Sequence, residues 1–346
     1  MLYITCVSVF GPPVPDPSLH PMSHPFFSQD AWKFGTFNGT RYHYLSIKST
    51  GSKPYILLLH GFPNGPFGYH AFIPLLTEKG YGVILPELLG YGDTHKPDDI
   101  KEYAYKKQTG ELAALLDAES VDSVVLVGHD FGSPLAARFA GYYPKRSLAL
   151  ILASTPYARP APTGLNPDFL HTVFKPLLGY ENIGHVKYFS SPLAPKQLDE
   201  HLDIFVGLLY SSVEDWRTRL CPTGALEKSL QERYVAPVEP WFDEANRKIL
   251  TDYLKKTGLT GPTAWFRAAV SNVNVEDEST LDPHLKLPYL YISPEHDATY
   301  PPAVSKFQVP HFADITIKHP ATGHWVFEED PKGTADTVLV WLQSKG

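Results

Sequence analysis

The sequence predicts an α/β fold in which a mostly parallel, doubly wound sheet carries an inserted helical cap. Short apolar runs, typical of strands that are buried on both faces, alternate with helical patterns. The alternation stops after Ala153 and resumes near Leu287, and the stretch between them has helical spacing but no strand-like run. The chain has 346 residues, which is enough for one large domain with an insertion.

The expected strands begin at residue 33. Residues 33–37 and 41–47 flank an Asn-Gly pair, which favours a tight turn, so they form an expected antiparallel hairpin. Continuous apolar runs then follow at residues 55–59, 83–85, 123–127, 148–153 and 287–292. One more strand is expected at residues 314–318. Apolar runs of this length suit a parallel sheet that is covered on both faces.

Helical patterns separate these strands. Residues 108–118 place Leu112, Leu115 and Leu116 on one face of a helix. Residues 134–140 are rich in small side chains, which allow a helix to pack close to a sheet. A C-terminal helix is expected from about residue 334 to 342. Strand and helix therefore alternate on both sides of the insertion.

The chain is expected to divide into three regions. Residues 1–30 are rich in proline and predict an irregular N-terminal arm, while residues 31–156 and 281–346 predict the α/β core. Residues 157–280 predict the helical cap. Apolar side chains recur there at helical spacing at Leu198, Leu202, Phe205 and Leu209, and again at Ala245, Ile249 and Tyr253. We expect the cap to lie over the carboxyl ends of the strands, where open α/β sheets bind ligands.

Composition and charge narrow the classes of partner. The formal net charge is −7 and no Lys/Arg-rich run occurs, so we expect neither a nucleic-acid partner nor an anionic membrane surface. No apolar run is long enough to span a bilayer, and no Lys or Arg precedes Lys33, which argues against a signal peptide. Cys6 and Cys221 are expected to be unpaired thiols in a reducing compartment, the cytoplasm.

Asp130 is the predicted nucleophile. It stands in residues 128–132 (GHDFG), between a buried strand and a small-residue helix. This arrangement is typical of the turn that lifts the nucleophile above the sheet in α/β hydrolases, with Asp in place of Ser. The alternative is an Asp that only caps the following helix. The same substitution argues against a serine esterase, because the nucleophile position holds no serine.

A second loop predicts the oxyanion hole. Residues 60–63 (HGFP) follow the first strand of the expected parallel sheet. In α/β hydrolases this loop supplies one backbone N–H, here that of Phe62. The residue after the nucleophile, Phe131, supplies the other N–H. An ordinary Gly-Pro loop is the alternative interpretation of residues 60–63.

His324 and Asp297 are the predicted base and its orienting acid. His324 follows the last expected strand, where the base of this fold lies. Its rival is His319, which precedes a proline and is therefore restricted in its backbone. Asp297 lies just past the preceding strand, between nucleophile and base in chain order, and Glu295 is its rival. A turn-forming Asp is the alternative for Asp297.

Four short motifs lie along the expected core, at residues 60–63 (HGFP), 90–93 (GYGD), 128–132 (GHDFG) and 323–325 (GHW). Together they resemble the soluble epoxide hydrolase family of α/β hydrolases, and the resemblance covers the chain from about Trp32 to its end. It implies two tyrosines in the cap that hold and protonate the epoxide oxygen.

The two tyrosine motifs are not equally well matched. Tyr188, in residues 188–192 (YFSSP), is similar to the first. The second motif is an aromatic pair followed by arginine, with tyrosine just before the arginine. In residues 261–267 (GPTAWFR), Phe266 stands where that tyrosine is expected. One of the two phenols is therefore missing.

The resemblance implies a reaction in two stages. Asp130 attacks the epoxide carbon, and Tyr188 protonates the alkoxide that forms. Water activated by His324 and Asp297 then hydrolyses the ester on Asp130. The expected partners are a small apolar substrate and water, with no cofactor and no metal. The residues expected to contact the substrate are Trp265, Phe266, His129 and Tyr157.

Three alternatives use the same fold. A haloalkane or haloacid dehalogenase needs the same Asp-His-Asp set and halide-binding N–H donors, for which Trp265 is available. A repurposed enzyme could open or cyclise an epoxide without forming an ester, which the missing tyrosine and the long cap motivate. A non-catalytic ligand receptor is the third alternative, although a receptor has no need of a complete triad.

Overall fold

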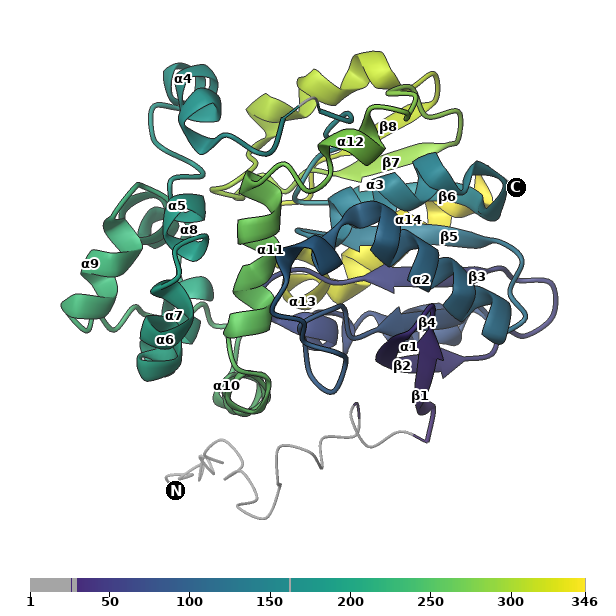
Figure 1. Cartoon of the computed structure of the whole chain (residues 1–346), viewed down its shortest axis with the longest axis horizontal. Coiled ribbons are helices and arrows are strands. Elements are labelled where there is room, and N and C mark those ends of the chain that lie inside the picture. The colour runs from purple at the N-terminus through teal and green to yellow at the C-terminus, as the bar shows by residue number, and fades with distance from the viewer. Residues whose placement is uncertain (1–25, 27–29, 162, 346) are drawn as a thin grey trace, which may run out of the picture.

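The computed structural model describes residue 26 and residues 30–161 and 163–345. Most of the predicted N-terminal arm, including Cys6, lies outside the described residues. Within them, eight strands form one sheet in the order β1-β2-β4-β3-β5-β6-β7-β8 (Figure 1). The strands are β1 (Trp32–Phe37), β2 (Thr40–Ile47), β3 (Tyr55–Leu59), β4 (Gly82–Pro86), β5 (Val124–His129), β6 (Ser147–Ala153), β7 (Tyr289–Ile292) and β8 (Ile315–Lys318). β1 and β2 pair antiparallel, β2 and β4 pair antiparallel, and every other pairing is parallel, which confirms the predicted sheet.

Helices cover both faces of this sheet. Successive residues of a strand point to opposite faces. In β3, Ile56 and Leu58 therefore belong to one buried apolar cluster, whereas Leu57 and Leu59 belong to another. The first cluster includes side chains of α1 and α14, and the second includes those of α2 and α3, which lie in front of the sheet in Figure 1. The core helices are α1 (Ile73–Thr77), α2 (Tyr105–Ala118), α3 (Gly132–Tyr142), α13 (Val326–Glu329) and α14 (Pro331–Gln343), with short 3₁₀ helices at Gly65–Tyr69, Ile100–Tyr103, Pro144–Arg146 and Pro302–His311.

Several elements begin a few residues away from the predicted positions. α14 begins at Pro331 because the side chain of Asp330 caps it and accepts a hydrogen bond from the N–H of Gly333. β7 begins at Tyr289 rather than at 287, directly after Pro288, which has no N–H to donate to a neighbouring strand. The ends of the elements are thus decided by local caps and prolines.

The chain between β6 and β7 is helical. Its helices are α4 (Pro167–Leu178), α5 (His185–Phe189), α6 (Ala194–Glu200), α7 (Leu202–Leu209), α8 (Val213–Asp215), a π-helical turn (Trp216–Leu220), α9 (Ala225–Gln231), α10 (Glu244–Thr257), α11 (Thr260–Val270) and α12 (Val275–Glu278). We call residues 157–280 the helical segment. Figure 1 shows most of it beside the sheet, with α11 between α5–α9 and the core. α11 contacts α5 and α6 on one side and the 3₁₀ helix Ile100–Tyr103 on the other.

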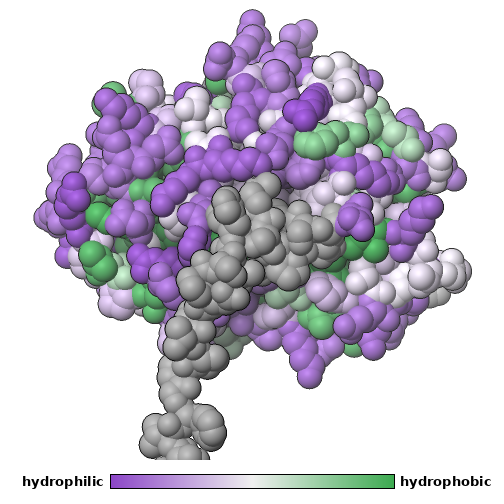
Figure 2. All heavy atoms as spheres, turned by 90° about the horizontal axis from the view of Figure 1, so that it is seen from below, coloured by the Kyte–Doolittle hydropathy of each residue, from purple (hydrophilic) through white to green (hydrophobic). Residues whose placement is uncertain are grey.

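Three further observations concern the lengths of the helices, one face of the surface and the thiol of Cys221. Among the described residues, every helix is too short or too polar to cross a membrane. Figure 2 shows a face on which hydrophilic residues predominate and hydrophobic residues are scattered. Cys221 is buried in the helical segment and has no disulfide partner within the described part of the chain.

Candidate active site

Asp130 occupies the sharp turn between β5 and α3. Its φ is 50°, in the left-handed region that side chains other than glycine seldom adopt. The flanking glycines are required by space, because a Cβ on Gly132 would overlap the carbonyl oxygen of Leu59 and one on Gly128 would overlap the backbone of Gly132. Such strain is typical of functional positions and projects the carboxylate away from the sheet.

The carboxylate of Asp130 lies against backbone donors. The N–H of Phe62 donates to Asp130 Oδ1 over 2.9 Å, and the N–H of Phe131 is a second donor to the same carboxylate. The first loop approaches this closely because Gly61 has no side chain, and a Cβ there would overlap Asp130. Burial raises the pKa of Asp130, while His324 and the two N–H groups act in the opposite direction. Both N–H groups predicted for the oxyanion hole therefore lie at this carboxylate.

His324 lies between two carboxylates. Its Nδ1 is 3.1 Å from Asp297 Oδ2, and its Nε2 is 3.9 Å from Asp130 Oδ2. Burial alone would lower the pKa of His324, but the charge and hydrogen bond of Asp297 outweigh it and raise the pKa above its usual value. Because Nδ1 faces a carboxylate, it carries a proton, which leaves Nε2 of the neutral ring free to accept one.

Asp297 is fully buried and kept ionised by hydrogen bonds. Its Oδ1 accepts from the N–H and the hydroxyl of Thr299, over 2.7 and 2.6 Å, and from the N–H of Tyr300 over 3.2 Å. Burial alone would raise the pKa of Asp297, but His324 and these donors hold it well below its usual value. Sequence reasoning missed Thr299, although a hydroxyl two residues after an Asp is a common local donor.

The rivals of these two residues lie elsewhere. His319 is exposed, and its Nδ1 is 3.1 Å from the carbonyl oxygen of Ser293. Glu295 is exposed near the start of the loop after β7. Neither residue lines the cavity that contains Asp130.

The backbone of His324 is held by two side chains. Its carbonyl oxygen accepts from the hydroxyl of Ser154 over 2.8 Å and from Nε2 of His129 over 2.9 Å. Burial lowers the pKa of His129 to about 3, so the ring is neutral and its one proton serves this bond. His129, predicted to contact the substrate, therefore contacts the backbone of His324. Ser154, with a φ of 63°, was not predicted.

The loop of His324 is also joined to the helical segment. The indole N–H of Trp325 donates to the carbonyl oxygen of Leu209 over 2.8 Å, and the indole N–H of Trp216 donates to the same oxygen over 3.1 Å. The ring of Tyr210 stacks on Trp325, with 5.0 Å between ring centroids and 10° between planes. The end of α7 is thereby fixed to Trp325, the residue next to His324.

Asp130 and His324 open into a cavity of about 510 Å³. Among the five phenylalanines that line it are four whose rings contact one another with centroids 4.6 to 4.8 Å apart. They are Phe62 and Phe131 from the core and Phe189 and Phe266 from the helical segment. Such rings exclude water and favour apolar ligands. An open depression of about 640 Å³, bordered by α6 and Arg267, is lined by neither Asp130 nor His324.

The predicted proton donor Tyr188 and two of the predicted contact residues, Trp265 and Tyr157, lie outside this cavity. The hydroxyl of Tyr188 donates to Gln197 Oε1 over 3.0 Å, and its neighbour Phe189 lines the cavity instead. The indole of Trp265 donates to the carbonyl oxygen of Leu89 over 2.8 Å. The hydroxyl of Tyr157 donates to the carbonyl oxygen of Pro283 over 2.8 Å.

Of the four predicted contact residues, Phe266 alone lines the cavity among the described residues. Sequence reasoning did not find three polar rings that do line it, namely Tyr105, Tyr300 and His185. No motif marks them, because they come from segments that are far apart in the chain.

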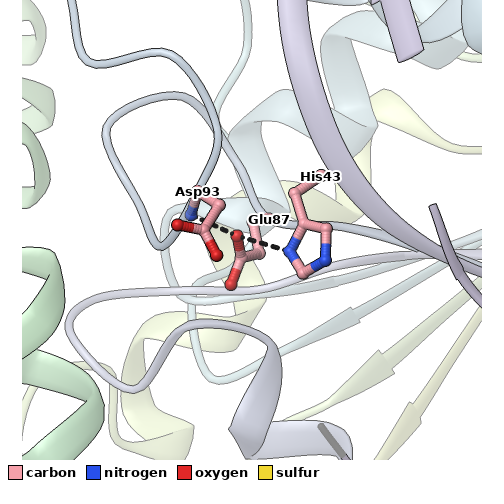
Figure 3. Close-up of side chains that lie close together, drawn as sticks. All are labelled: His43, Glu87 and Asp93. Atoms are coloured by element: carbon pink, nitrogen blue, oxygen red, sulfur yellow. Dashed lines mark hydrogen bonds and ion pairs between the residues drawn. The ribbon is translucent and has the colours of Figure 1, made fainter. Parts of the chain in front are cut away.

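One cluster outside the cavity offers atoms of the kind that bind metal ions. Single ligand atoms of His43, Glu87 and Asp93 lie within 4.8 Å of one another (Figure 3). His43 Nδ1 and the N–H of Asp93 both contact Glu87 Oε2, at 3.0 and 2.6 Å, and the Asp93 carboxylate pairs with Lys256 Nζ at 2.7 Å. Because these groups already partner one another, we interpret the cluster as a set of polar contacts between β2 and the loop after β4.

The chain resembles known proteins over most of its length. Residues 54–182 match the model of the alpha/beta hydrolase fold family. The chain is 31% identical over 232 residues to epoxide hydrolase 2 of Siraitia grosvenorii, covering 67% of this chain and 70% of that protein. It is 26% identical over 318 residues to bifunctional epoxide hydrolase 2 of Mus musculus, covering 89% of this chain and 54% of that protein. The chain thus spans about half the length of the mouse relative.

A solved structure shares the fold. A Vigna radiata epoxide hydrolase mutant matches with a TM-score of 0.75 and 22% identity, covering 90% of this chain and 98% of that one. Three observations support the same family assignment, namely the sheet order, the turn at Asp130 and the similarity to the Siraitia protein. The chain therefore belongs to the epoxide hydrolase family of the α/β-hydrolase fold.

Proposed function

We propose that this chain opens an epoxide to a vicinal diol through an ester on Asp130. The observation that carries the proposal is the position of His324, whose two ring nitrogens face Asp297 and Asp130 at the wall of an aromatic cavity. A carboxylate nucleophile with a base beside it suits displacement at carbon followed by hydrolysis. The names of the relatives agree with this chemistry.

The first stage forms the ester. Asp130 Oδ1 accepts the N–H of Phe62, so Oδ2 is the oxygen that attacks the epoxide carbon. The new bond joins Oδ2 to carbon, the ring C–O bond breaks, and its electron pair goes to the ring oxygen. That oxygen takes a proton and becomes the first hydroxyl of the diol.

The second stage hydrolyses the ester. Nε2 of His324 takes a proton from water, and the hydroxide attacks the Asp130 carbonyl carbon while Asp297 stabilises the imidazolium. Negative charge develops on Oδ1, which faces the N–H of Phe62, and the N–H of Phe131 is a second donor at the same carboxylate. Collapse expels the second diol oxygen, which takes the proton from His324. Asp130 is left as a carboxylic acid and ionises.

The helical segment is proposed to act as a cap that supplies the apolar part of the cavity. Phe189 from α5 and Phe266 from α11 face Phe62 and Phe131 from the core. A cavity of about 510 Å³ with these walls suits an apolar epoxide of the size of a drug-like ligand.

A dehalogenase is a weaker proposal. Halide release needs N–H donors, and the indole N–H groups of Trp216 and Trp265 already donate to backbone carbonyls. A repurposed enzyme that forms no ester remains the alternative, since Phe189 and Phe266 bring no hydroxyl to the cavity.

The test is an intact-mass spectrum of the His324→Gln variant after exposure to styrene oxide. We expect the mass to rise by one epoxide molecule, because alkylation needs no imidazole and hydrolysis does. The Asp130→Ala, His324→Gln double variant is the control and should gain nothing. Absence of an adduct in the single variant would contradict the ester mechanism and favour the ester-free alternative.

A further inference from the structure

The proposed ring opening needs a proton donor, and no phenol from the described part of the helical segment lines the cavity. Phe189 and Phe266 line it, and the hydroxyl of Tyr188 is bonded to Gln197. The remaining titratable ring on this side is His185, whose pKa burial lowers to about 4. At neutral pH that ring is uncharged, so it has no imidazolium proton to give. An alkoxide formed in this cavity must be protonated by another group.

Two phenols line the core side of the same cavity. Tyr300 follows β7 and Tyr105 begins α2. Within the described residues, neither hydroxyl has a hydrogen-bond partner. By contrast, the phenols of Tyr188 and Tyr157, which lie outside the cavity, are both bonded to protein acceptors. The two cavity phenols are therefore available to a bound ligand.

Tyr300 is the better placed of the two. It stands three residues after Asp297, and its N–H donates to Asp297 Oδ1 over 3.2 Å, so the loop that orients the base also fixes this residue. Burial raises the pKa of Tyr300, and the nearby charges of Asp130 and then Asp297 raise it further. The pKa of Tyr105 is also raised by burial, but among its charged neighbours Asp130 has the smallest effect on that pKa. Tyr300 is thus protonated and within electrostatic reach of the nucleophile.

We propose that Tyr300 donates the proton to the epoxide oxygen as Asp130 attacks, with Tyr105 as a second hydrogen-bond donor. The ring oxygen receives the electron pair of the broken C–O bond and the phenolic proton of Tyr300. After ester hydrolysis Asp130 is a carboxylic acid, and the proton that it releases restores the phenol of Tyr300, so the cycle balances. This inference rests on the proposed function, because a donor is needed only if an epoxide is opened.

The test measures alkylation alone. In the His324→Gln background, which should accumulate the ester, the rate of adduct formation with styrene oxide is followed by quenched intact-mass spectra. One hydrogen bond to a charged group is typically worth about 1.5–3 kcal/mol. Tyr300→Phe should therefore slow alkylation by roughly ten- to a hundred-fold. Tyr105→Phe should slow it less, and Tyr188→Phe should change it by less than about threefold.

A control and a second readout separate chemistry from structure. Tyr142→Phe removes a phenol whose ring does not line the cavity and should leave the rate unchanged. In the background that retains His324, Tyr300→Phe should leave the rate of ester decay within about threefold of the parent. Slowed decay would instead mean that the hydroxyl supports the loop of Asp297 and His324 and does not serve the epoxide oxygen, and it would overturn the donor role.

The two proposals fail in different ways. If the His324→Gln parent forms no adduct, the ester mechanism is lost and this inference falls with it. If the parent forms the adduct and Tyr300→Phe forms it equally fast, only the donor role of Tyr300 is overturned. A large loss at Tyr188 with none at Tyr300 would return the donor to the helical segment.

Discussion

The two sides of the cavity differ in chemistry. The core side carries Asp130, His324 and Tyr300, and hydrogen bonds hold the first two side chains in place. The helical segment contributes mainly apolar side chains, among them Phe189 and Phe266. Loops at the ends of parallel strands are fixed by the sheet, whereas short helices depend on their own packing. The difference teaches that the groups proposed to react belong to the core side, where hydrogen bonds fix them, and that the segment supplies the apolar surroundings.

The most severe way to break the core side is Asp130→Ala. We expect turnover to fall on the order of 10⁴-fold or more, as for other catalytic triads that lose their nucleophile. The protein should still unfold cooperatively near the parent midpoint, because the substitution removes a buried carboxylate whose burial opposes its charge, which offsets the strain that Ala keeps at a φ of 50°. Steady-state kinetics and calorimetry check this. The exposed Asp122→Ala is the matched control, and activity within tenfold of the parent in Asp130→Ala would reject the nucleophile.

Asp297→Asn should damage the second stage more than the first. An amide can still contact Nδ1, but it cannot stabilise the imidazolium, and a comparable change in a serine protease costs about 10⁴-fold. We expect ester decay to slow by roughly 10²- to 10⁴-fold while alkylation changes little. Single-turnover mass spectra separate the two rates. Glu295→Gln is the control. An equal slowing of ester decay in that variant would assign the role of orienting acid to Glu295.

Phe266→Tyr sharpens the comparison by returning a phenol to the helical side. In the Tyr300→Phe background, a hydroxyl at 266 should recover part of the lost alkylation rate, by up to about tenfold, through one hydrogen bond to the alkoxide. In the parent, which still has its own donor, the gain should be smaller. Phe189→Tyr is the companion variant on α5. Further loss in both variants would mean that the apolar wall cannot accept a hydroxyl.

The smallest expected effect is a shift with pH. His324 must be neutral to take a proton from water, and Asp297 raises its pKa. The rate of ester decay should therefore be at its maximum above that raised pKa, and it should fall as the pH falls through it. In Asp297→Asn the raising charge is gone, so the midpoint of the residual decay should move to lower pH. A midpoint that stays in place would show that another group titrates.

The sequence predicted the core better than the cavity, for a physical reason. The turn around Asp130 is specified locally, because its glycines and the preceding strand determine where the side chain lies. The positions of His324 and Asp297 follow from strand order, since both come directly after strands of the sheet. These features need only short-range patterns and topology.

The side chains of the helical segment could not be predicted in this way. α5 has five residues, so a rotation of one position decides whether Tyr188 or Phe189 faces the cavity. That rotation depends on packing against α11, which lies far away in the chain. Thr299, Ser154 and Tyr300 were missed because their roles depend on contacts that appear only once the loops are assembled.

The shared acceptor at Leu209 has a consequence for the order of events. A movement of α7 wide enough to admit a ligand would break the bond to Trp325 and release the residue next to the base. Under the proposed mechanism, ester hydrolysis is then expected only when α7 is seated, so an enzyme that is open for ligand entry should stall at the ester. Trp325 would lose its acceptor in such a movement, and its indole emission would therefore record each opening in time.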